Sequence, residues 1–245
     1  MTYPNWTIWN GLRAIKRIGK RGLGLGPRPV GKVNLGDLNS VRPISMNFGG
    51  DRGLPIDRYY IEAFLQRHAL DIVGRVLEIG DDSYSQRFGG QRIEHQDILH
   101  VHPGNPRATL VGELADPAVV EDNSFDCMII TQTLQFIYEF QTTIARIHQA
   151  LRPGGVVLLT VPGISQIDRG EWKSVWYWAF TTASMTRLFI SVFGEDAVTV
   201  TNLGNVFAAT AFLQGLSVGE VDTRKLDVID DAYQVVITVR ARKEG

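Results

Sequence analysis

The sequence predicts an α/β fold in which a mainly parallel sheet is doubly wound, with helices on both of its faces. Short apolar runs alternate with segments of helical periodicity from residue 55 to residue 240, which is typical of such sheets. The most informative run is RVLEIG at 75–80, where an apolar strand ends in Glu78 and Gly80 follows at once. Ligands of these sheets bind outside the carboxyl ends of the strands, and a glycine there lets the backbone turn sharply beside them.

The predicted domain begins with a helix and three strands. Pro55 suits a first helical turn, and Ile56, Tyr60 and Phe64 lie on one helical face, so a helix is expected over 55–69. The strands that should follow lie at 76–79, 93–97 and 108–111.

The second half continues the alternation. Turn residues at 122–124 introduce a buried strand at 125–131, where Cys127 is expected in the core. Pro153-Gly154-Gly155 ends a helix over 139–151. The elements expected after it are a strand at 156–161, a helix to Phe193 capped by Thr181 or Thr182, a strand at 198–201, a helix at 205–217 and a strand at 233–240.

Composition places the chain among ordinary globular proteins. Its 245 residues suffice for one large α/β domain. A single cysteine excludes an intrachain disulfide, which fits a reducing compartment. The longest apolar runs, such as 156–161, are too short to span a bilayer, and the start of the chain has no secretory signal pattern. We therefore expect a cytoplasmic protein.

Charge divides the chain into a basic arm and an acidic body. Seven lysines and arginines and no acid precede Asp37, although the whole chain has a net charge of −1. Residues 22–36 are rich in glycine and proline and are expected to form a flexible linker. We therefore expect an arm and linker over 1–45 and one large α/β domain over 46–245.

Residues 5–21 of the arm have the pattern of a basic amphipathic helix. The apolar residues of one face are Ile8, Leu12, Ile15 and Ile18, and the opposite face carries only lysines and arginines. Such a helix suits peripheral contact with an anionic membrane surface, with Trp6 and Trp9 at headgroup level. Docking on the protein's own acidic body and a disordered arm are the alternatives, and nucleic acid is not the expected partner.

Three segments of the domain resemble a known enzyme family. They are RVLEIG at 75–80, EDNSFDCMIITQTLQFI at 121–137 and IHQALRPGGVVLLTVPG at 147–163, of which LRPGG followed by a strand is the most specific. Their order and spacing resemble the class I S-adenosylmethionine-dependent methyltransferases, above all the small enzymes that act on sugars, polyketides and other metabolites. The resemblance implies a seven-stranded sheet whose last strand, at 233–240, is antiparallel.

The resemblance also implies a cofactor site for S-adenosylmethionine. Glu78 and Gly80 match the loop that holds the methionine part, and Asp97, as the end of the second strand, matches the acid that accepts from the ribose hydroxyls. The other matching residues are Glu113, which would face the adenine amino group, Leu114, which would supply a backbone amide, and Thr131 with Gln132, which would line the methyl-transfer pocket. Each also has a purely structural interpretation, as a strand-end acid, a turn residue or a solvated side chain.

One departure from the family pattern concerns the cofactor loop itself. Where the family has three alternating glycines, positions 80, 82 and 84 are Gly80, Asp82 and Tyr84. Asp81 or Asp82 would pair with the cationic amino group or sulfonium, and Tyr84 would stack on the ligand or bond to it. The alternative is a disabled cofactor loop.

The acceptor would be held by the segment after the fifth strand, as the resemblance implies. Residues 162–180 include five aromatic side chains, which suit a sugar ring or a flat acceptor, or else pack on the body of the domain. A hydroxyl acceptor needs a base, for which this segment offers Asp168, Glu171 and Tyr177, although the sequence does not single one out.

We therefore predict a methyltransferase that uses S-adenosylmethionine, with O-methylation of a small molecule or saccharide unit as the expected reaction. The alternative is a non-catalytic binding or scaffold protein that keeps the fold. A nicotinamide oxidoreductase is disfavoured because G-x-G-x-x-G is absent after the first strand. No metal is expected, since the spacing of His95, His100 and His102 matches no metal-site pattern.

Overall fold

The computed structural model describes residues 31–245. The chain divides into two compact units, Met1–Val41 and Arg42–Gly245. The described part of the first unit contains one short 3-10 helix, η1 (Gly36–Leu38). The predicted amphipathic helix at 5–21 lies outside the described residues.

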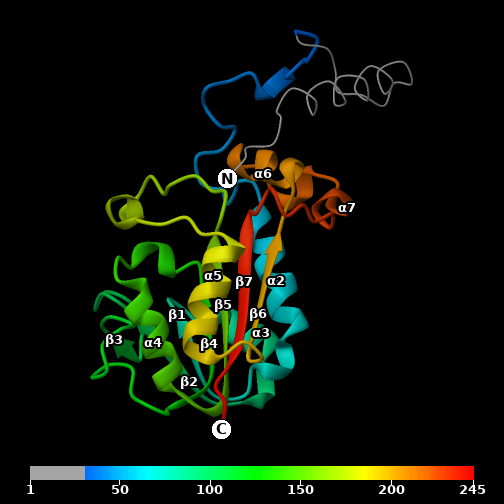
Figure 1. The fold of residues 1–245 in the computed structure, drawn as a ribbon. Helices are drawn as coiled ribbons and strands as arrows, with labels where there is room; N and C mark the ends of the chain where they lie inside the picture. Colours follow the sequence, from blue (N-terminus) through cyan, green and yellow to red (C-terminus); the bar gives the residue numbers. More distant parts are fainter. Residues whose placement is uncertain (1–30) are drawn as a thin grey trace. The chain divides into compact units, whose positions relative to one another are not determined.

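The second unit is built on a sheet of seven strands in the order β3-β2-β1-β4-β5-β7-β6 (Figure 1). All neighbouring strands are parallel except β7, which runs antiparallel to both β5 and β6. The predicted fold class is therefore confirmed. The strands are β1 (Gly74–Ile79), β2 (Ile93–His100), β3 (Leu110–Val111), β4 (Phe125–Thr131), β5 (Leu151–Pro162), β6 (Val198–Leu203) and β7 (Val236–Arg242).

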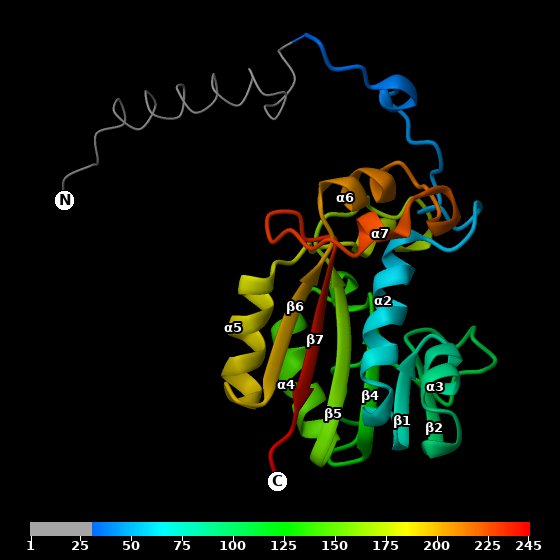
Figure 2. The ribbon, with the colours of Figure 1, turned by 90° about the vertical axis from the view of Figure 1, so that its right-hand side faces the viewer.

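Helices cover both faces of this sheet, as Figure 2 shows for α4 and α5 on one side and α2 and α3 on the other. Alternate residues of β4 serve the two cores: Met128 and Ile130 pack with α4 and α5, whereas Cys127 and Ile129 pack with α2 and α3. The helices are α2 (Ile56–Arg67), α3 (Ser83–Phe88), α4 (Phe140–Ala150), α5 (Thr182–Phe193), α6 (Val206–Leu213) and α7 (Thr223–Leu226).

Several predicted boundaries change because pairing between strands extends them. β2 continues to His100, since Ile98 and Leu99 stay paired with β1 and His100 pairs with β3. β5 begins at Leu151, which pairs with Phe125 across a register shift. Conversely, α6 ends at Leu213, four residues before the predicted end, and β7 begins three residues later than predicted.

Two further features of the second unit bear on the sequence predictions. Thr181 caps α5, because its hydroxyl oxygen accepts a hydrogen bond from the backbone N–H of Ser184. Cys127 is fully buried, as predicted. Within residues 31–245, no helix has the length and apolar character needed to cross a membrane.

Candidate active site

A cavity of about 740 Å³ opens at the carboxyl ends of the central strands. Its lining includes Gly80 after β1, His100 at the end of β2 and Thr131 at the end of β4. The chain leaves β1 toward β2 and β3 on one side, whereas β4 and β5 lie on the other. The cavity therefore occupies the place where the strand order reverses, which is where doubly wound sheets bind their ligands. Its volume is in the range of small-molecule and cofactor sites.

Five of the residues that the resemblance placed at the site line this cavity: Gly80, Glu113, Leu114, Thr131 and Gln132. Gly80 has a φ of 84°, a left-handed conformation that side chains rarely adopt, so the turn after β1 requires glycine. Leu114 is buried, whereas Glu113 is exposed at the cavity edge. The structure thus brings predicted residues together from the ends of three strands, β1, β3 and β4.

Glu78 is buried and is not among the residues that line the cavity. Its carboxylate accepts hydrogen bonds from the backbone N–H of Tyr84 at 3.1 Å and of Ser85 at 2.7 Å. Burial raises the pKa of Glu78 to about 7, although the hydrogen bonds from Ser85 and Tyr84 act in the opposite direction. In this position Glu78 holds the first turn of α3 against the end of β1.

Asp97 requires a correction. The prediction that it ends the second strand is wrong, because β2 continues for three more residues to His100. The buried Asp97 carboxylate accepts hydrogen bonds from Arg75 Nε at 2.7 Å and Thr109 Oγ1 at 2.9 Å. It is not among the residues that line the cavity, so the geometry does not support the ribose contact implied by the resemblance.

The residue at the end of β2 is His100, which was not predicted to belong to the cofactor site. His100 and His102 both line the cavity. His100 Nδ1 lies 2.9 Å from the carbonyl oxygen of His102 and 3.2 Å from its backbone nitrogen, which fixes the ring. His100 follows Gly80 by about 20 residues, the separation at which dinucleotide folds place the residue that binds the ribose. That spacing was the signal available in the sequence.

The side chains of the cofactor loop, residues 80–84, interact with other groups of the protein. Asp81 accepts from the backbone N–H of Ser83 at 2.8 Å. Asp82 pairs with Arg107. Tyr84 bonds to the Arg58 side chain, and its ring stacks on Phe88 with centroids 6.2 Å apart. None of Asp81, Asp82 and Tyr84 lines the cavity.

The aromatic segment after β5 contributes Trp172 and Tyr177 to the cavity lining. Trp172 lies in the 3-10 helix η5 (Glu171–Val175), and Tyr177 follows this helix. Trp172 packs against Phe136, with ring centroids 5.1 Å apart. Tyr177 packs edge-on against Tyr138 at 5.4 Å. The segment therefore both packs on the domain and faces the cavity, which combines the two interpretations of the sequence.

The predicted base candidates differ in their positions. Glu171 and Tyr177 line the cavity. The Asp168 carboxylate instead accepts from the backbone N–H of Gly170 at 3.1 Å and of Trp172 at 3.0 Å, which holds the turn into η5. Glu139, which precedes α4, lines the cavity and was not predicted; its place at the start of a predicted helix after the fourth strand was the available signal.

The carboxylates that line the cavity have no lysine or arginine beside them in the described lining. The described lining residues include Glu113, Glu139 and Glu171 and no lysine or arginine. Among the described residues, no group of three potential ligands is arranged to hold a metal ion. The arrangement therefore favours neutral or cationic ligand groups over anionic ones.

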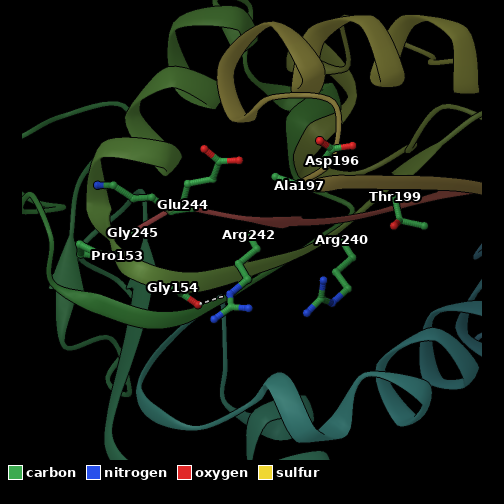
Figure 3. A pocket seen from close by; sticks show the side chains of 10 residues that line it. Pro153, Gly154, Asp196, Ala197, Thr199, Arg240, Arg242, Glu244 and Gly245 are labelled. Carbon is green, nitrogen blue, oxygen red and sulfur yellow. Dashed lines mark hydrogen bonds between the residues drawn. The ribbon is translucent and has the colours of Figure 1, made fainter.

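A second cavity, of about 600 Å³, lies at the opposite end of the strands (Figure 3). Arg240 and Arg242 of β7 extend into it. Both guanidinium groups have protein partners: Arg240 forms two hydrogen bonds with Asp71, and Arg242 Nε donates to the carbonyl oxygen of Gly154 at 3.1 Å. None of the predicted site residues lies there.

Comparison with known proteins identifies relatives of the domain. The family model described as a methyltransferase domain matches residues 63–159. A Mycolicibacterium smegmatis protein named "Probable S-adenosylmethionine-dependent methyltransferase" is 28% identical over 145 residues, which are 52% of this chain. The match spans 56% of that relative's own length.

Two solved structures have a similar fold. A methyltransferase from Archaeoglobus fulgidus, described as SAM dependent, has a TM-score of 0.51 and 9% identity, over 76% of this chain and 94% of that one. The [4+2]-cyclase SpnF has a TM-score of 0.52 and 13% identity, over 84% of this chain and 88% of that one. At such identities the likeness shows the fold alone. Together with the domain match, it confirms the predicted resemblance: this chain has the fold of the class I S-adenosylmethionine-dependent methyltransferases, and residues 63–159 match the model of a methyltransferase domain.

Proposed function

We propose that this chain transfers a methyl group from S-adenosylmethionine to an oxygen of a small molecule or saccharide unit. The observation that supports this most is the composition of the cavity at the carboxyl ends of the strands. Several of the residues matched to the cofactor site line it, and so do aromatic side chains and carboxylates of the segments that follow β4 and β5. A cofactor and an acceptor would thus share one cavity, as alignment of the reacting atoms requires.

The residues of the cavity fit the cofactor chemically. S-adenosylmethionine has a cationic sulfonium and a cationic amino group, and the described lining residues include three carboxylates without a lysine or arginine. The turn at Gly80 allows close approach of the backbone, Glu113 with the Leu114 amide would hold the adenine, and His100 would face the ribose. When bound, the cofactor supplies an electrophilic methyl group.

The acceptor side fits a neutral, hydroxyl-bearing molecule. The rings of Trp172 and Tyr177 offer faces on which a sugar ring can stack. The carboxylates of Glu139 and Glu171 can accept hydrogen bonds from hydroxyl groups, and one of them would take the acceptor's proton as the oxygen is methylated. Asp168 is unsuited to this role because its carboxylate already holds two backbone N–H groups.

Methyl transfer from labelled S-adenosylmethionine to three acceptor classes tests this proposal: neutral saccharides, amines and phosphorylated sugars. We expect transfer to the neutral class, because an anionic acceptor would face the cavity carboxylates without a compensating cation. Loss of the base, through Glu139→Gln or Glu171→Gln, should lower kcat by about 100-fold or more.

The matched control is Lys173→Gln, because Lys173 is an exposed residue of η5 outside the cavity lining. Its kcat should equal that of the wild type. Preferred transfer to amines or to phosphorylated sugars, or an unchanged kcat in both glutamine variants, would contradict the proposed acceptor chemistry.

A non-catalytic binding or scaffold role is the second candidate, and the glycine-poor cofactor loop favours it. The fold itself does not decide the reaction, since SpnF, a [4+2]-cyclase, has a similar fold. Tight binding of S-adenosylhomocysteine, together with no methyl transfer to any acceptor class, would favour this candidate over the enzyme.

The N-terminal arm would bring the domain to an anionic membrane surface through residues 5–21. The separation of apolar and basic side chains in the sequence supports this part of the proposal. The full chain should co-sediment with anionic vesicles at low salt, and a chain that starts at residue 37 should not, because the basic residues are missing. Equal binding by both chains would contradict the membrane contact.

A further inference from the structure

We propose that the loop between β2 and β3, residues 101–109, acts as a clasp that holds the cofactor loop, residues 80–84, in its binding conformation. Asn105 and Arg107 are then positioning residues for the cofactor. The inference rests on the proposed function, because it concerns the loop that would hold S-adenosylmethionine. It also accounts for the departure of this loop from the three-glycine pattern.

Two side chains of the clasp contact the cofactor loop directly. Asn105 Nδ2 donates a hydrogen bond to the carbonyl oxygen of Gly80 at 2.6 Å. The Arg107 guanidinium pairs with the Asp82 carboxylate, whose side chain is 19% exposed. One contact fixes the first residue of the turn after β1, and the other fixes its third residue. The turn is therefore held from outside at two points.

The clasp is itself tied to the sheet. Asn105 Oδ1 accepts from the backbone N–H of Arg107 at 3.0 Å, which orders the loop around the two contacting side chains. At the end of the loop, Thr109 Oγ1 donates to the buried Asp97 carboxylate at 2.9 Å, and Arg75 Nε donates to the same carboxylate at 2.7 Å. Asp97 thus anchors the clasp to β1 and β2.

Backbone conformation explains why the loop tolerates an aspartate. Asp82 has φ −117° and ψ 18°, which an L-residue adopts without glycine's freedom. Gly80, with its φ of 84°, is the residue that needs this freedom. A side chain at position 82 is therefore compatible with the turn, and its carboxylate provides the group that Arg107 holds.

The clasp also positions the wall of the cavity beside the cofactor loop. His102 belongs to the clasp and His100 immediately precedes it, and both line the cavity together with Gly80. Displacement of the clasp would move the residues on both sides of the predicted ribose position. We therefore expect its loss to weaken cofactor binding more than it weakens the fold, since partly exposed ion pairs contribute little stability.

Charge reversal tests the clasp by calorimetric titration of the full chain with S-adenosylhomocysteine. Asp82→Arg and Arg107→Asp should each weaken binding by about 10-fold, because each places two like charges together at the loop. The double variant, Asp82→Arg with Arg107→Asp, should return the affinity to within about 3-fold of the wild type. This rescue would show that the effect comes from the pairing of the two side chains, because only the double variant again places opposite charges together.

The control is the ion pair between Arg87 and Glu62, whose side chains are 58% and 19% exposed, as are those of Arg107 and Asp82. Arg87→Asp breaks this pair between α3 and α2 and should leave the affinity unchanged. Single clasp reversals that bind S-adenosylhomocysteine as the wild type does, or a double reversal that is folded but not rescued, would overturn the clasp alone. A wild-type chain that binds no S-adenosylhomocysteine would overturn the proposed function and the clasp together.

Discussion

Replacing Asp97 with alanine is expected to lower the free energy of unfolding by about 3 kcal/mol, because a buried ion pair loses one partner. The Asp97 side chain is 5% exposed and that of Arg75 is 29% exposed. Removal of the carboxylate leaves Arg75 Nε and the Thr109 hydroxyl without their acceptor. The estimate is at the lower end for such pairs because water can still reach Arg75. Urea denaturation monitored by circular dichroism measures the change.

Asp97→Asn is the matched control for this prediction, since it keeps the size of the side chain and one acceptor oxygen. Its loss of stability should be smaller than that of Asp97→Ala. An Asp97→Ala protein with wild-type stability and a large loss of S-adenosylhomocysteine affinity would contradict the structural role. Such a result would instead support the ribose contact of Asp97 that the family resemblance implied.

The contribution of Glu78 to the stability of the chain is expected to fall as the pH rises toward neutrality. Burial raises the folded-state pKa of Glu78 to about 7, above its ordinary value of 4.5. Between these values the folded state binds more protons than the unfolded state, so stability decreases with rising pH. The contribution is fully present below pH 4.5 and is lost as the pH rises through about 7. The shift corresponds to about 3 kcal/mol.

Glu78→Gln isolates this contribution because glutamine does not titrate. From pH 4 to pH 8, the free energy of unfolding of the wild type should fall by about 3 kcal/mol relative to that of Glu78→Gln. Urea denaturation at several pH values gives this difference. A difference that does not change with pH would show that Glu78 titrates at its ordinary pKa in the folded protein.

Periodicity and turn residues predicted most of the fold from the sequence. The strand at 125–131 is confirmed at both ends, because turn residues precede it and both of its faces are buried. The end of β2 escaped prediction because its continuation beyond Asp97 depends on pairing with β1 and β3. A mixed sequence such as DILHVH has no local pattern that shows how far such pairing extends.

The same distinction applies to the site. Gly80 lies in the cavity as expected, because the strand-to-glycine pattern is local. The orientation of Asp82 toward Arg107 is not local, since it depends on where the β2–β3 loop lies. Glu139 and His100 likewise enter the site through the arrangement of strands and not through a motif. Local motifs thus indicated the end of the sheet where the cavity lies, and tertiary contacts decide which side chains line it.

Calorimetric titration of the full chain with S-adenosylhomocysteine, with NAD as the comparison ligand, tests directly whether the cavity at the strand ends binds the methyltransferase cofactor. Saturable binding of S-adenosylhomocysteine with a one-to-one stoichiometry is expected, with a Kd on the order of 1–100 µM, because the cavity at the strand ends fits this ligand. His100→Ala should weaken that binding, whereas Glu94→Ala should not, because Glu94 is an exposed residue of the same strand outside the cavity lining. NAD should give no binding. Binding of NAD in preference to S-adenosylhomocysteine, or no binding of S-adenosylhomocysteine at millimolar concentration, would contradict the account.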